Sequence, residues 1–208
     1  MRRAVGAIVA QEGSALAAHP RALSAAEATT RDLADAVHAL CALHGTAPSV
    51  IEIAADSNGA AEHRAWLRDA AVAFDAERRA LVALTAAVGP LPSTPGQAES
   101  SAAIEGQRHA LAMLARSDRA GCALGAALAF MLEWHALRAL LEAAAARAGL
   151  ATELNHLPSP VEIEGIADRA AADPRVARAL AFGADQLVAQ HRGLWHLLDA
   201  RASARRGS

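Results

Sequence analysis

Residues 120–148 read AGCALGAALAFMLEWHALRALLEAAAARA, and this stretch decides the fold class. Its apolar residues recur every three or four positions, as at Leu124, Leu128 and Met131, which is the spacing of one face of an α-helix. Residues 120–132 carry no charge, which is typical of a helix buried in a core, and that run is too short to span a membrane. The stretch therefore predicts a buried helix, and no membrane span is expected.

The composition of the whole chain extends this prediction. More than a quarter of the 208 residues are alanine, tyrosine is absent, and aromatic residues make up 3%. Alanine has the highest helix propensity, whereas the residues that favour strands, such as Tyr, Phe and Thr, are scarce. The length suits one core rather than two. We therefore predict a single all-α domain over residues 1–208, an antiparallel bundle of about five long helices with one short helix crossing it.

Capping residues and turn residues mark where the predicted helices begin and end. Ser24 with Glu27 has the pattern of a capping box, and Thr94-Pro95 has that of an N-cap followed by proline at the first helical position. The long helices are predicted at 24–44, 59–88, 95–116, 118–148 and 174–202, and the short one at 160–171. Loops are expected at 45–59 and 150–159, and loosely ordered tails at 1–22 and 203–208.

Two boundaries leave alternatives open. Residues 95–148 form either a hairpin that turns at Ser117-Asp118 or one continuous helix, and the hairpin is favoured because a helix of about fifty residues would be unusually long. Residues 50–53 form either a short extended piece or a turn of helix. The core is expected to contain the apolar residues of the helical stripes: Leu33, Val37, Leu40, Trp66, Phe74, Leu81, Leu84, Ile104, Leu111, Leu124, Leu128, Met131, Leu180, Leu187 and Leu194.

Charge and cysteine usage bear on partners and compartment. The net charge is −2, and all 20 basic residues are arginine, a bias that coding composition explains better than anion recognition. No global basic field is present, so no nucleic-acid partner is expected. Cys41 and Cys122 are too few for a disulfide framework, which favours reduced thiols and a cytoplasmic protein. The apolar run at 4–10 resembles a signal peptide only faintly, because Gln11-Glu12 interrupts it.

Gly121 and Gly125 place two small residues about one helical turn apart. This spacing allows another helix to approach closely. We expect that helix to belong to the same chain, and the alternative is a second copy in a homo-oligomer. The sequence does not specify a protein partner.

Polar residues interrupt the apolar stripes of three predicted helices. Glu77, His135 and His191 each occupy a stripe position near the midpoint of their helix. The midpoints of antiparallel neighbours lie at similar heights, so these side chains are expected to share one layer inside the bundle. Glu105 and His109, at positions i and i+4 of another helix, are candidates to complete that layer.

This polar layer has two interpretations. Imidazole and carboxylate groups bind metals in helical bundles, and haem needs only one or two axial ligands. The candidate metal ligands are Glu77, His135, His191, Glu105 and His109, with a second group at His38, Cys41 and His44. In the other interpretation, which we favour, the buried groups hydrogen-bond one another or the backbone, and no cofactor is bound.

The sequence contains none of the common catalytic motifs, such as G-x-S-x-G, H-E-x-x-H or C-x-x-C. The Glu-x-x-His pattern of ferritin-like di-iron proteins occurs once, at Glu153 and His156 in a predicted loop, so no di-iron ligand set is assigned. We therefore expect a binding or assembly protein without catalysis. The alternative is a metal- or cofactor-binding bundle, including an oxidase-type enzyme.

Overall fold

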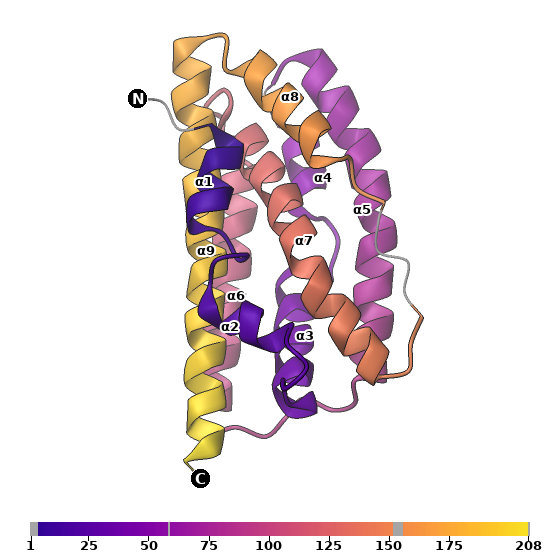
Figure 1. The fold of residues 1–208 in the computed structure, drawn as a ribbon. Coiled ribbons are helices and arrows are strands. Elements are labelled where there is room, and N and C mark those ends of the chain that lie inside the picture. Colours follow the sequence, from indigo (N-terminus) through magenta and orange to yellow (C-terminus); the bar gives the residue numbers. More distant parts are fainter. Residues whose placement is uncertain (1–3, 58, 152–155, 208) are drawn as a thin grey trace.

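The structure, a computed structural model, describes residues 4–57, 59–151 and 156–207. These ranges contain helices and no strand, so the predicted all-α class is confirmed (Figure 1). The helices are α1 (Val5–Glu12), α2 (Ala18–Leu23), α3 (Thr30–His44), α4 (Val50–Ala55), α5 (Ala61–Ala87), α6 (Gln97–Ala115), α7 (Cys122–Arg147), α8 (Pro160–Ala170) and α9 (Pro174–Arg206).

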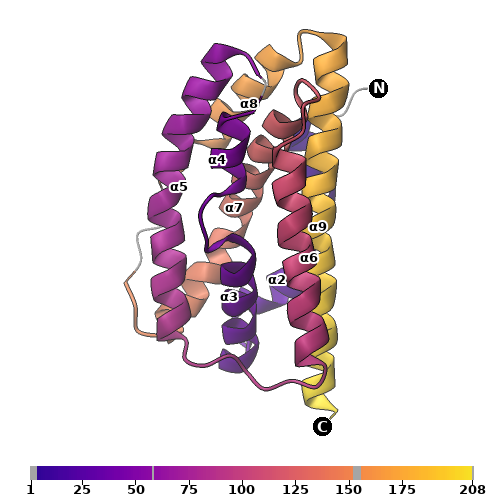
Figure 2. The same cartoon turned by 180° about the vertical axis from the view of Figure 1, so that it is seen from behind.

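Helix α7 lies at the centre of the fold and packs against helices on every side, including α1, α4, α6, α8 and α9. It is long and apolar enough to cross a membrane, and among the described residues it is the one helix that meets this test. However, 72% of its most apolar window is buried by the rest of the chain, as in a core helix. Behind α7, the shorter helices α3 and α4 follow one another between α5 and α6 (Figure 2).

Helices α7 and α9 form the most extensive helix pair, and glycines allow their close contact. A Cβ atom on Gly125 would clash with the backbone carbonyl of Leu180, and one on Gly183 would clash with that of Cys122. Gly121 likewise faces Val176 of α9. The small residues of α7 therefore serve a contact within the chain, the favoured alternative of the two predicted.

The N-terminal segment differs from the prediction. A loose tail was predicted at 1–22, but over the described residues 4–22 the chain forms α1 and α2, because Val5, Ile8 and Val9 bury one face of α1 against α7 and α9. At the other end, α9 continues to Arg206 rather than ending at 202.

Helix α3 begins later than predicted, because Thr29 rather than Ser24 is its N-cap. The Thr29 hydroxyl accepts a hydrogen bond from the Asp32 amide, whereas Ser24 donates to the carbonyl of Pro20. Residues 50–55 form a helix, α4, whose start is fixed by a capping box between Ser49 and Glu52.

The hairpin between α6 and α7 is confirmed, since residues 116–121 separate the two helices. Helix α6 starts at Gln97 after Gly96, whose φ of 72° suits glycine. Thr94, the predicted N-cap, instead accepts hydrogen bonds from the C-terminal arginines of α9.

The predicted core residues are all buried except Trp66 and Ile104, which are partly buried. Part of the predicted loop at 150–159, including Glu153, lies outside the described residues.

Candidate functional site

The interior holds a chain of five hydrogen-bonded side chains, which we call the buried network: Trp195, Ser14, Glu133, His191 and His44. Ser14 follows α1, Glu133 lies on α7, His191 and Trp195 lie on α9, and His44 is the last residue of α3. All five are buried, and the exposed fraction is 0% for Glu133 and 1% for His191. Segments far apart in sequence therefore meet at one polar point in an apolar core.

Glu133 is the centre of the buried network. One of its oxygens accepts the backbone N–H of Ser14 at 2.9 Å. The other accepts the Ser14 hydroxyl at 2.5 Å and Nδ1–H of His191 at 2.9 Å. Trp195 Nε1–H donates to the Ser14 hydroxyl oxygen at 2.7 Å. These hydrogen bonds compensate for much of the cost of burying a carboxylate.

The last hydrogen bond of the buried network joins the imidazoles of His191 and His44, whose Nε2 atoms lie 3.1 Å apart. Because Nδ1 of His191 donates to Glu133, Nε2 of a neutral His191 is an acceptor. His44 then carries its proton on Nε2 and donates it to His191. With a protonated His191 the direction of this bond reverses, and Nε2–H of His191 donates to Nε2 of a neutral His44.

The environment lowers the pKa values of two members of the buried network, Glu133 and His44. Burial alone would raise the pKa of Glu133, but the hydrogen bond and charge of His191, together with the Ser14 hydrogen bonds, hold it below its ordinary value. Burial, and next the charge of His191, lower the pKa of His44 well below the ordinary value. The structure therefore favours an ionised carboxylate beside a neutral His44.

Gly13 explains how the carboxylate reaches the end of α1. A Cβ atom at this position would clash with Oε1 of Glu133, so only glycine leaves room for the carboxylate beside the backbone. Gly13 is also the C-cap of α1. The turn that ends α1 thus presents the Ser14 amide and hydroxyl to Glu133.

The order of the groups limits the chemistry of the buried network. In a serine nucleophile site, the hydroxyl hydrogen-bonds to an imidazole that removes its proton. Here the Ser14 hydroxyl donates to a carboxylate, and the imidazole lies on the far side of that carboxylate. The network therefore holds groups in position but does not activate Ser14 as a nucleophile.

Two cavities adjoin opposite ends of the buried network. The first, about 840 Å³, lies between the α1–α2 segment and α9, and its lining includes Ser14 and Trp195. The second, about 230 Å³, lies between the α3–α4 connection and α6, and its lining includes His44, Glu105 and His109. The hydrogen-bonded side chains thus connect two places that a small molecule can reach.

Glu77 and His135, two predicted site residues, lie at a separate place between α5 and α7. The buried Glu77 carboxylate accepts Nε1–H of Trp134 at 3.0 Å and the backbone N–H of His156 at 2.9 Å. Arg138 lies 3.6 Å from the same carboxylate. Glu77 is therefore a buried carboxylate whose hydrogen bonds are satisfied by its neighbours in the core.

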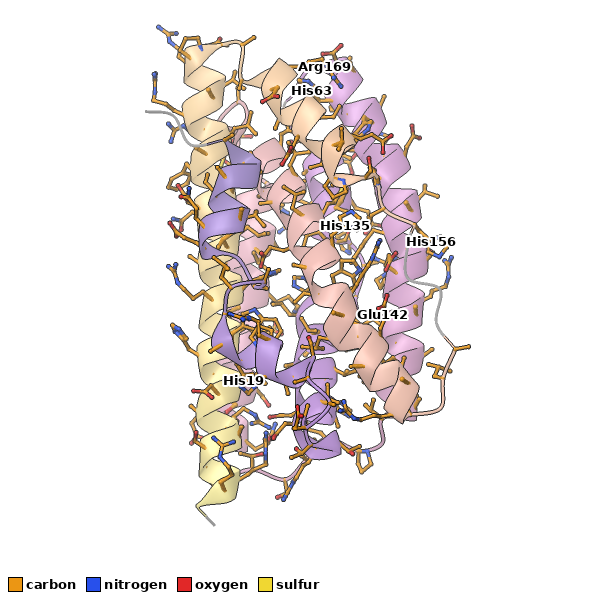
Figure 3. All side chains as sticks on the ribbon, viewed as in Figure 1. His19, His63, His135, Glu142, His156 and Arg169 are labelled. Atoms are coloured by element: carbon orange, nitrogen blue, oxygen red, sulfur yellow. The ribbon has the colours of Figure 1, made fainter. Side chains whose placement is uncertain are left out.

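His135 is half-buried and its Nε2 contacts the carbonyl of Pro158 at 2.9 Å (Figure 3). Burial lowers its pKa, as does the charge of Arg138, while the Pro158 carbonyl and Glu77 act in the opposite direction. A neutral His135 that donates Nε2–H to Pro158 fits these surroundings.

The structure divides the remaining predicted ligands between other places. His191 belongs to the buried network, and Glu105 and His109 are exposed on α6, where Glu105 pairs with Arg108. In the second predicted group, His44 bonds to His191 while Nε2 of His38 bonds to the carbonyl of Gly89. Over the described part of the chain, no three His, Cys, Asp or Glu side chains are grouped so that they would hold a metal ion.

Sequence reasoning missed Glu133 and Ser14, the central members of the buried network. Glu133 lies outside the stripe chosen for α7, but α7 is buried on most of its surface, so no single stripe describes it. Ser14 lies in the segment predicted as a loose tail. A carboxylate directly after the uncharged run at 120–132 was the signal that would have pointed to Glu133.

Comparison with known proteins places the chain in a family. No curated protein matches it, and neither does any solved structure. One family, described as a family of unknown function (DUF6975), matches residues 9–206, which include every member of the buried network. The chain therefore belongs to this family of unknown function.

Proposed function

We propose that this protein binds a small molecule without transforming it, and that the ligand occupies the 840 Å³ cavity between the α1–α2 segment and α9. The single observation that carries the proposal is this cavity, whose volume lies within the range of about 300–1,000 Å³ that is usual for ligand pockets. The longer helices α3, α5, α6, α7 and α9 would form the antiparallel frame that supports it.

The lining of this cavity indicates the chemistry of the ligand. Leu16, Leu23 and several alanines supply an apolar surface, to which Trp195 adds an aromatic edge. One ion pair and one hydrogen-bonded pair lie among the lining residues: Glu12 with Arg192 at 3.2 Å, and His19 with Asp199 at 3.4 Å. We infer that the ligand has an apolar body and a polar group that meets these charges.

The buried network supports binding rather than catalysis. Its hydrogen bonds fix Ser14 and Trp195, so this part of the cavity wall is rigid before a ligand binds. Binding then costs less conformational entropy. The same bonds occupy the Ser14 hydroxyl, the nucleophilic group of the network that lines this cavity.

The test uses the amphipathic dye 1-anilinonaphthalene-8-sulfonate as the probe. Ala22 lines the cavity from α2 and is exposed, so Ala22→Trp fills space without disturbing the core. The matched control is Ala65→Trp, an exposed position on α5 that is not part of the lining. We expect dye affinity to fall about tenfold or more in A22W, equivalent to about 1.4 kcal/mol, and to stay unchanged in A65W. Equal affinity in wild type and A22W, with unchanged circular dichroism, would refute the proposed cavity.

The alternative function, a metal or haem centre inside the bundle, has one observation in its favour. Glu133 binds Nδ1 of His191 and leaves Nε2 facing a second imidazole, which is how carboxylates orient metal-binding histidines. Metal analysis and an absorption spectrum of protein purified without a histidine tag separate the two functions. Stoichiometric zinc, manganese or iron, or a Soret band, would replace the ligand-binding proposal.

A further inference from the structure

Arginines gather around a third cavity, at the end of the molecule where α5, α7 and α9 begin (Figure 1). This cavity has a volume of about 300 Å³, and its lining includes Arg64 of α5, Arg119 of the α6–α7 connection and Arg169 of α8. His63 also lines it, and Figure 3 shows His63 and Arg169 close together between α5 and α8. It shares no lining residue with the cavity of the proposed function.

The charges around this cavity are unbalanced. None of Arg64, Arg119 and Arg169 forms an ion pair with another residue in the described ranges. Asp173 is the one carboxylate among the described lining residues, and it caps α9 through the Arg175 amide. Three guanidinium groups and one carboxylate give a local charge of +2 (3 − 1).

A polar atom at the same place also lacks a partner. Nε of Arg64 is buried and makes no hydrogen bond, and the Arg64 side chain forms no hydrogen bond or ion pair with another residue of the described chain. A buried donor without an acceptor costs stability, so an acceptor supplied by a ligand would be stabilising.

Arginines elsewhere in the described chain are of two kinds: some pair with a carboxylate, and others, such as Arg21, Arg68 and Arg178, do not. Outside this cavity, each of the following contacts at least one carboxylate: Arg78, Arg79, Arg108, Arg138, Arg192, Arg201 and Arg205. What distinguishes Arg64, Arg119 and Arg169 is that three unpaired guanidinium groups line one cavity, which favours an anionic ligand.

The N-termini of two helices also favour an anion at this cavity. Helices α5 and α7 begin beside this cavity after Ala60 and Gly121, neither of which caps the helix with its side chain. Their first-turn N–H groups therefore lack side-chain acceptors, and the positive ends of the helix dipoles face the cavity region. Helix ends of this kind add to the attraction that the arginines exert on an anion.

We propose that this cavity binds the phosphate group of a small soluble phosphate ester. A phosphate monoester carries a charge of about −1.5 to −2 at neutral pH, which balances the local charge of +2, whereas a carboxylate would leave it half neutralised. Its oxygens accept the paired N–H groups of guanidinium, and Arg119 is held in place by Phe182, whose ring centre lies 5.7 Å away. The volume admits the phosphate and a few further atoms, and this suits a small ester rather than a polymer.

The experiment titrates inorganic phosphate and methyl phosphate into the full chain at low ionic strength, with calorimetry as the readout. Arg64→Gln and Arg169→Gln are each expected to weaken phosphate binding about tenfold or more, and the double variant to abolish it. The control is Arg79→Gln, which removes an exposed arginine from the same helix as Arg64, one that pairs with Asp75 outside the cavity. Its affinity for phosphate should equal that of the wild type.

Thermal unfolding separates ligand binding from a structural role of these arginines. Because the three guanidinium groups repel one another, R169Q without phosphate is expected to unfold at the wild-type temperature or above it. Phosphate should raise the unfolding temperature of the wild type and not that of the double variant. The proposal fails if phosphate has no saturable effect, if R79Q weakens binding as much as R64Q, or if the protein sediments with phosphatidic acid vesicles but does not bind free phosphate.

Discussion

At the scale of single residues, three buried carboxylates hold distant parts of the chain together, each with a different set of partners. Glu133 binds an imidazole, a hydroxyl and an amide, whereas Glu77 binds an indole, an amide and the more distant Arg138. Asp35 binds the guanidinium groups of Arg201 and Arg205. A buried charge is costly unless these partners stay in place, so each carboxylate fixes the positions of the helices that supply them.

Removing Glu133 should therefore be far more costly than its size suggests. In Glu133→Ala, the Nδ1–H of His191 and the amide of Ser14 lose their acceptor in the core, and we expect a loss of about 3–5 kcal/mol in the free energy of unfolding. The matched control, Glu142→Ala, changes an exposed glutamate of the same helix and should cost less than about 0.5 kcal/mol. Urea unfolding of both variants measures the difference. Similar losses would show that the buried network adds no stability beyond that of an exposed glutamate.

His44 should make stability depend on pH. Its pKa is lowered well below the ordinary value in the fold, because of burial and the charge of His191, so the unfolded chain binds more protons than the fold as pH falls below about 6.5. Stability should then decrease towards acid by up to about 1.4 kcal/mol per pH unit from this group. The other charged or titratable groups near His44 are Glu133, reached through His191, and Glu105, Arg108, His109 and Arg116 of the adjoining cavity.

His44→Gln tests this pH dependence, because its amide can still donate to His191 but does not titrate. Between pH 7 and pH 5, we expect a shallower loss of stability in this variant than in the wild type. His109→Gln, at an exposed histidine of the same cavity, serves as the control and should keep the wild-type slope. Parallel curves for H44Q and the wild type would mean that His44 does not titrate in this range.

At the scale of helices, the sequence predicted the elements whose ends carry strong signals. Helices α5, α7, α8 and α9 begin within a few residues of the predicted positions, because glycine, proline and capping residues mark their ends. Helices α1 and α2 were missed, since their N-caps are alanines that make no side-chain cap. Their stability comes from burial against α7 and α9, which no local pattern in the segment shows.

The α7–α9 contact should depend on its glycines. Gly183→Ala places a methyl group on the Cys122 carbonyl and near the amide of Ala126, both backbone atoms that cannot move separately from α7. We expect a loss of about 1–3 kcal/mol in the free energy of unfolding, as for overpacked cores. Gly106→Ala, in the middle of α6 with no atom near the added methyl group, should instead stabilise by about 0.5–1 kcal/mol. Chemical unfolding measures whether each variant raises or lowers the free energy of unfolding, and stabilisation by both variants would contradict the close packing of α7 and α9.

At the scale of the whole molecule, the sequence predicted many of the residues that face inward but not which of them meet. Periodicity predicted burial for Glu77 and His191, and both are buried. It contained no information on the rotation and axial shift of one helix relative to another, and these decide contacts. Glu77 therefore meets the backbone of His156, and His191 meets Glu133 and His44, with Trp134 between the two groups.

Helix α9 contacts helices from both ends of the chain, and its C-terminal arginines join it to α3. Arg201 donates to both oxygens of the buried Asp35, at 3.0 Å from Nε and 2.8 Å from Nη2. This pair links residues that are 166 positions apart, so it should act on the stability of the whole fold and not on one helix.

A double-mutant cycle with Asp35→Ala and Arg201→Ala measures this link. Each single variant removes a charged partner from a buried charge, although Asp35 keeps Arg205, so we expect a coupling free energy of more than about 1 kcal/mol and a double variant less destabilised than the sum of the two. The pair of Glu12 and Arg192 also joins α9 to a distant segment, but both side chains are exposed by more than a third. Its cycle should give about 0.2–1 kcal/mol, and the same coupling in both cycles would mean that burial adds nothing to the Asp35–Arg201 pair.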